Sequence, residues 1–123
     1  MKEFKIVPKV CLDREEDGEK IPATFKGHVV VKVPKFSERQ EFRSIAIGLA
    51  LETDQKIQSI DSLPTLTKLV EKSKEFYVSV EMECLEDGTK FSSYEDLEYD
   101  PRCEKIMQEV AMNLSRGIVP GKN

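Results

Sequence analysis

Apolar and β-branched residues gather in two runs in the first third of the chain, and polar residues separate the runs. The first run is Phe4–Val7, and the second, Thr24–Val33, is rich in valine and ends before Pro34. Between them lies Asp17-Gly18, a pair that readily adopts the positive φ angles of a tight turn. We therefore expect an N-terminal β-hairpin with a long charged loop.

Helical spacing begins after Ser37. The hydroxyl of Ser37 can cap a first helical turn, and Gln40 three residues later completes a capping-box pattern. This pattern predicts a helix over about residues 38–52. Its apolar face would carry Phe42, Ile45, Ala46 and Leu49.

Residues in the middle of the chain carry two competing patterns. An Asp-Ser pair shortly before Pro64 marks a helix start, since proline is tolerated in a first turn. Apolar residues at spacings of three and four then continue to Cys84, which favours one long helix. Over residues 76–84, however, apolar and polar residues also alternate, in residue types that favour strands. We predict a helix through about Lys72 and leave residues 76–84 open between strand and helix.

Turn and capping signals organise the last third. Asp87-Gly88 predicts a turn, and Ser92-Ser93 can cap a short helical turn. Asp100 gives the last helix a carboxylate cap and Pro101 its first position. Gly117 marks the end of that helix, whose apolar face consists of Ile106, Met107, Val110, Ala111 and Leu114.

Together these elements predict an α+β fold in which an N-terminal β-hairpin packs with three or more α-helices. Helices are expected to dominate. The chain has 123 residues, which is enough for one hydrophobic core and too short for two. We expect a single globular domain over residues 1–116 and a short flexible tail over residues 117–123.

Composition limits the classes of function. Apolar residues make up 39% and charged residues 34%, which indicates a globular protein with a charged surface. A net charge of −4 disfavours a general nucleic-acid binder, because such proteins need a basic surface. The longest apolar run, residues 45–51, is far shorter than a membrane span, and the N-terminus has no signal-peptide pattern. Three widely spaced cysteines favour reduced thiols, so we expect a cytoplasmic protein. From the charge and the short apolar runs we expect neither nucleic-acid nor membrane partners.

Candidate catalytic groups give little support for an enzyme. His28 is the only histidine and lies in the valine-rich run, so a place on the polar face of a strand is favoured over a metal site. The acidic stretch 95–100 lacks the spacing and internal glycine of an EF-hand loop. Gly121-Lys122 is not a phosphate-binding loop, because Arg116 stands where that motif requires glycine. We therefore predict no catalytic residue, no metal and no cofactor.

The stretch YVSVEMECLEDGTKFSSYEDLEYDP (residues 77–101), with the capped helix after it and the ending GIVPGKN, resembles the tail assembly chaperones of bacteriophages with long, non-contractile tails. The resemblance covers mainly residues 63–123. It implies a small protein of the host cytoplasm that coats the tape measure protein, helps to recruit the tail-tube protein and is absent from the mature virion. It also implies self-association and a function by binding, without a cofactor.

The same resemblance gives the chain end and the helix faces a function. In this family a ribosomal frameshift near the end of the short reading frame adds a C-terminal extension, and codons for Gly121 and Lys122 can form part of a slippery run. A chaperone of this kind needs apolar helix faces as contact surfaces, although for most of these residues a place in the core is favoured. The candidate interaction residues are Phe42, Ile45, Leu49, Leu66, Val70 and Tyr77.

Two other hypotheses stay open. The chain could be another structural or adaptor component of phage or bacterial origin, such as a minor virion protein. It could also be a small enzyme with a carboxylate site near Glu95, Asp96 and Asp100.

Overall fold

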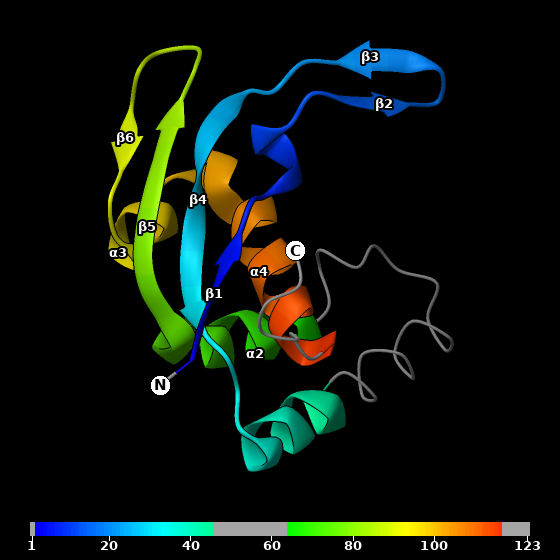
Figure 1. Ribbon diagram of the computed structural model, residues 1–123, viewed down its shortest axis with the longest axis vertical. Helices are drawn as coiled ribbons and strands as arrows, with labels where there is room; N and C mark the ends of the chain where they lie inside the picture. Colours follow the sequence, from blue (N-terminus) through cyan, green and yellow to red (C-terminus); the bar gives the residue numbers. More distant parts are fainter. Residues whose placement is uncertain (1, 46–63, 117–123) are drawn as a thin grey trace.

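A four-stranded antiparallel sheet carries helices on one of its faces in the computed structural model, which describes residues 2–45 and 64–116 (Figure 1). The fold is α+β, as predicted from the sequence. The strands, in their order across the sheet, are β1 (Glu3–Ile6), β4 (Phe25–Lys32), β5 (Tyr77–Cys84) and β6 (Lys90–Phe91). The labelled helices are α2 (Pro64–Ser73), α3 (Tyr94–Glu98) and α4 (Glu104–Arg116).

The N-terminal hairpin is formed by β1 and β4, whose register places Phe4 opposite Val31 and Ile6 opposite Val29. The charged segment between them is not a simple loop. After a 3-10 turn, η1 (Lys9–Cys11), it forms a second hairpin that projects from the body (Figure 1). Its tip is Asp17-Gly18, with φ angles of 52° and 80°, so the predicted turn is confirmed. The strands beside it, β2 (Arg14–Glu16) and β3 (Glu19–Ile21), were not predicted.

Residues 77–84 form a strand, which resolves the alternative that the sequence left open. After α2 the chain tightens into a 3-10 turn, η3 (Lys74–Phe76), and then enters β5 between β4 and β6. Val80 and Met82 are buried on the inner face of the sheet, and Glu81 between them is exposed. The segment forms a strand because β4 pairs with it along most of its length, with one irregularity between Val30 and Val31, and offers it an apolar inner face.

The helix predicted over residues 38–52 begins earlier than its proposed cap implied. Residues 36–45 are helical, so Ser37 lies inside the first turn and is not the cap. At the start of the helix it is the Glu38 carboxylate that accepts a hydrogen bond, from the Lys35 N–H at 2.8 Å. Leu49 and the predicted helix end lie outside the described residues.

The predicted helix starts of the last third are confirmed. Ser93 caps α3 by accepting a hydrogen bond from the Asp96 N–H at 3.3 Å. Asp100 accepts one from the Arg102 N–H at 3.0 Å at the start of a 3-10 turn, η4 (Pro101–Cys103), which leads into α4. Gly117 and the predicted tail 117–123 lie outside the described residues.

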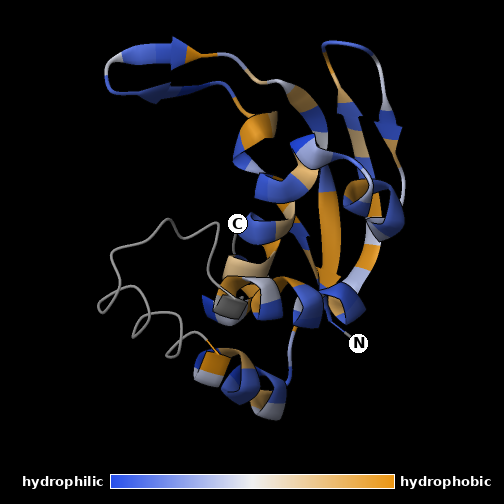
Figure 2. Ribbon diagram, turned by 180° about the vertical axis from the view of Figure 1, so that it is seen from behind, coloured by the Kyte–Doolittle hydropathy of each residue, from blue (hydrophilic) through white to orange (hydrophobic). Residues whose placement is uncertain are grey.

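The core lies between the inner face of the sheet and helices α2 and α4. Figure 2, seen from the helix side, shows the apolar length of β4 behind the helices. The opposite face of the sheet carries charged side chains. The most deeply buried core side chains include Val29, Val31, Phe42, Leu69, Leu97, Ile106, Val110 and Leu114.

Gly27 lies unusually close beside the backbone of β5 in the sheet. Its φ angle is 119°, and a Cβ atom there would overlap the backbone carbonyl of Glu81. We expect Gly27→Ala to lower the free energy of unfolding by roughly 3 kcal/mol. Urea denaturation measures this loss.

Gly88→Ala is the matched control. Gly88 also has a positive φ angle, 74°, but no heavy atom lies within 4 Å of an added Cβ. This variant should lose only about 1 kcal/mol, the cost of the left-handed conformation. Equal losses in the two variants would contradict the steric explanation.

Candidate interaction surface

Two of the predicted interaction residues, Phe42 and Leu66, are buried in the core. Phe42 is fully buried, and its ring centroid lies 5.4 Å from that of Phe76. Lys72 covers the same ring, with Nζ 5.5 Å from the centroid. Leu66 retains 2% exposure. These side chains join helix 36–45 and α2 to the domain and are not accessible to a partner in this conformation.

The other described members of the predicted set are half-buried. Ile45, Val70 and Tyr77 pack against the edge of the core. The Tyr77 ring meets that of Tyr94 edge-on at 4.6 Å, and its buried hydroxyl has no hydrogen-bond partner among the described residues. Burial raises the pKa of this hydroxyl far above its ordinary value, so Tyr77 stays neutral.

A shallow hollow between α2 and α4 brings part of the predicted set together. Its volume is about 190 Å³. Val70 and Met107 contribute half-buried apolar side chains, with Leu66 beneath them. The sequence assigned Met107 to the apolar face of α4 but did not single it out as a contact residue. Its neighbours at the margin are Thr67, Glu104 and Gln108.

The acidic stretch 95–100 is used for local structure. Asp96 accepts hydrogen bonds from the Ser92 N–H at 2.8 Å and from the Ser92 hydroxyl at 3.3 Å, and the backbone hydrogen bond is the main cause of its lowered pKa. The pKa of Asp100 is lowered chiefly by hydrogen bonds from the Arg102 side chain. In residues 2–45 and 64–116 no group of three or more acidic, histidine or cysteine residues could hold a metal ion.

Arg102 links the turn after β5 to the start of α4. Its guanidinium lies 2.8 Å from Asp100 Oδ2, 3.0 Å from Asp87 Oδ2 and 3.1 Å from Cys84 Sγ. Asp87 also accepts hydrogen bonds from the Thr89 N–H at 3.0 Å and the Thr89 hydroxyl at 2.7 Å, and these are the largest causes of its lowered pKa. These charge-assisted hydrogen bonds hold the turn after β5 against the 3-10 turn that leads into α4.

The cysteines are free thiols, as predicted. Burial raises the pKa of Cys11 and of Cys103 to about 11, with the Glu109 and Asp100 carboxylates adding to the effect. At pH 7 only on the order of one in 10,000 of these thiols is ionised, so neither is a ready nucleophile. Cys84 is buried in the core.

His28 lies on the open face of the sheet, where the sequence placed it. Its Nε2 atom is 3.5 Å from Glu81 Oε2 on the neighbouring strand. The next pair along the two strands is Lys26 and Glu83, whose Nζ and Oε1 atoms are 3.6 Å apart. These cross-strand pairs explain the residue types of the open face without a metal site.

Comparison of the chain with models of protein families, with curated protein sequences and with solved structures found no match. No helix within the described ranges is long and apolar enough to cross a membrane. Gly121 and Lys122, the predicted frameshift position, lie outside the described residues.

The burial of Phe42 yields a stability prediction. Phe42→Ala should lower the free energy of unfolding by about 3 to 5 kcal/mol, because the cavity lies between helix 36–45 and Phe76. Chemical denaturation checks this value. Phe36→Ala is the control on the same helix, since Phe36 is 67% exposed, and it should change stability by no more than about 0.5 kcal/mol. A loss that is small for both would show that Phe42 is not a core residue.

The Arg102 cluster yields a prediction on pH. Replacing Arg102 by Gln should raise the pKa of Asp100 strongly and that of Asp87 less, because Thr89 remains to hold Asp87. Carboxylate NMR titration measures both values. Arg14→Gln, which removes the exposed pair with Glu16, should leave both pKa values unchanged.

The stability lost in the Arg102→Gln variant should depend on pH. A carboxylate whose pKa is depressed by folding stabilises the protein above its unfolded pKa of about 3.9. That contribution disappears as pH falls through the lower folded pKa of Asp100. The stability difference between wild type and Arg102→Gln should therefore shrink on acidification. A difference that grew below pH 4 would contradict this assignment.

Proposed function

We propose that this protein is a tail assembly chaperone of a bacteriophage or prophage, which binds the tape measure protein in the host cytoplasm and assists tail-tube assembly. It acts by binding, without catalysis or a cofactor, and it self-associates. It is absent from the mature virion. A frameshifted longer form, with the shift at Gly121 and Lys122, recruits the tail-tube protein.

The stretch that resembles this family supports the proposal as a folded unit. Residues 77–101 build β5, β6, α3 and the first residue of η4, and α4 follows directly. The resemblance therefore extends over consecutive elements that contact one another: β5 pairs with β6, and α3 contacts β5, β6 and α4. Such a block can be retained as a whole in a diverged protein.

The hollow between α2 and α4 is the observation that carries the proposal. A tape measure protein is long and helical, and an amphipathic helix binds by laying apolar side chains into a groove between helices. Val70 and Met107 present apolar surface there, and Glu104 and Gln108 supply a polar margin. A site of this composition suits a helical client better than a small substrate.

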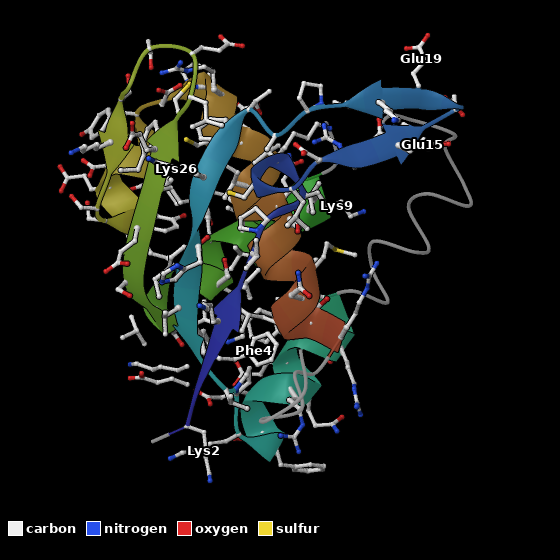
Figure 3. All side chains as sticks on the ribbon, turned by 45° about the horizontal axis from the view of Figure 1, so that its top comes forward. Lys2, Phe4, Lys9, Glu15, Glu19 and Lys26 are labelled. Carbon is white, nitrogen blue, oxygen red and sulfur yellow. The ribbon has the colours of Figure 1, made fainter. Side chains whose placement is uncertain are left out.

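An adaptor or minor virion protein is the alternative, and the β2–β3 hairpin favours it. The hairpin projects from the body, and Figure 3 shows Glu15 and Glu19 standing out from it. Charged side chains of this kind are found at the polar rim of protein interfaces. Detection of the chain in purified particles would favour this alternative, because a chaperone leaves before the particle is complete.

Co-expression tests the chaperone proposal. The wild-type chain should keep the tape measure protein of the same genome soluble and co-purify with it. Replacing Val70 and Met107 together by Glu should reduce the co-purified amount at least about tenfold, because both charges would enter an apolar contact. A wild-type chain that neither solubilises nor binds the tape measure protein would refute the proposal.

Val78→Glu is the matched control. Val78 is 42% exposed on β5, away from the hollow, and its replacement by Glu introduces the same charge. Binding should be unchanged in this variant. Circular dichroism and thermal unfolding show whether all variants retain the fold. Loss of binding in the control alone would place the client on a different surface.

A further inference from the structure

β1 is an edge strand among the strands that the structure describes. Within the described ranges it pairs with β4 alone (Figure 1). The Val33 N–H donates to the Lys2 carbonyl at 2.9 Å, so the backbone groups of Lys2 point toward the β4 side. Because backbone groups alternate in direction along an antiparallel strand, the N–H and C=O groups of Glu3 and Lys5 point away from the sheet.

The strand is held in place for pairing. Its start is fixed by the hydrogen bond to Val33, and the chain just beyond its end is fixed by Glu109 of α4. Both carboxylate oxygens of Glu109 accept from the Lys9 N–H at 3.1 Å. A preformed edge loses little conformational entropy when a partner strand binds.

The side chains of β1 divide between two faces. Glu3 and Lys5 are exposed on the open face of the sheet. Phe4 is half-buried on the inner face, and Figure 3 shows it on the α4 side of β1. It borders a hollow of about 410 Å³ between the strand and α4, with Val7 and Asn113 among the other lining residues. The edge therefore combines charged and apolar surface.

We propose that β1 pairs antiparallel with β1 of a second copy, about a two-fold axis at Phe4. Glu3 of each copy then lies opposite Lys5 of the other, and each such pair exchanges two backbone hydrogen bonds. The two sheets join into one. The carboxylate and ammonium groups meet on the open face, and the two Phe4 rings meet on the inner face.

The charges favour this register over its neighbours. A shift of the pairing in one direction places Glu3 opposite Glu3, and a shift in the other places Lys5 opposite Lys5. Like charges directly opposite each other destabilise a pair of strands. Lysine on an edge strand usually hinders pairing, but here each lysine has an acidic partner supplied by the second copy. A second copy thus meets the charge requirement that an arbitrary strand does not.

The short strand predicts a weak, reversible dimer, since four residues bury little area. This inference names the surface of the self-association included in the proposed function, but its test uses the isolated chain. A monomeric chain would overturn the interface and leave binding of a tape measure protein unaffected.

Sedimentation equilibrium between about 10 µM and 1 mM tests the proposal, with any affinity tag at the C-terminus. The average mass of the wild-type chain should rise toward that of a dimer. Glu3→Lys and Lys5→Glu should each raise the dissociation constant about tenfold or more, because each places two pairs of like charges at the interface. Glu15→Lys makes the same charge change on the projecting hairpin and should leave the dissociation constant unchanged.

A charge-swap experiment is the sharper test. Each single variant repels itself, but a mixture of Glu3→Lys with Lys5→Glu places opposite charges at every position. Native mass spectrometry of the mixture should show the heterodimer in excess over either homodimer. A wild-type chain that stays monomeric, single variants that dimerise as wild type does, or a mixture without the heterodimer would overturn the proposal.

Discussion

The antiparallel pairing of β4 with β5 joins two parts of the chain that are distant in sequence, and every other element is placed relative to it. Val29 and Val80 lie opposite each other in this pair, and both are buried. β1 and β6 extend the sheet on its two sides, and α2 and α4 cover its inner face. The pairing is also closely constrained, because only glycine at position 27 lets the backbone of Glu81 approach. Any side chain at this position would overlap the neighbouring strand.

Hydrogen bonds and ion pairs determine the relative positions of elements that apolar burial alone would not determine. Burial of valine and leucine favours contact but specifies little geometry. Arg102 connects the turn after β5 with the start of α4, and Glu109 connects α4 with the backbone of Lys9. Both link segments that are far apart in the sequence. They connect α4 and the turn before it to the end of β5 and to the 3-10 turn that follows β1.

The candidate contact surfaces show what the spacing of apolar residues can predict and what it cannot. Helical periodicity identified the apolar faces that carry Phe42 and Val70, but it cannot say what covers each face. The core takes Phe42 completely, whereas Val70 lies at the margin beside Met107 and remains half-buried. The self-complementary charges of Glu3 and Lys5 are visible in the sequence, yet they gain significance only when β1 is known to be an edge. Whether a residue lies on the surface or in the core depends on which elements pack against it.

The sequence alone determined the features that depend on neighbouring residues. These include the tight turn at Asp17-Gly18, the Ser93 cap and the start of the last helix at Asp100, because each involves hydrogen bonds or φ angles within a few residues. Only the tertiary structure decided whether residues 77–84 form a strand or a helix. Both periodicities are present in that segment, and a strand is satisfied only by partners far along the chain. β4 supplies the hydrogen bonds and the apolar face that settle the competition.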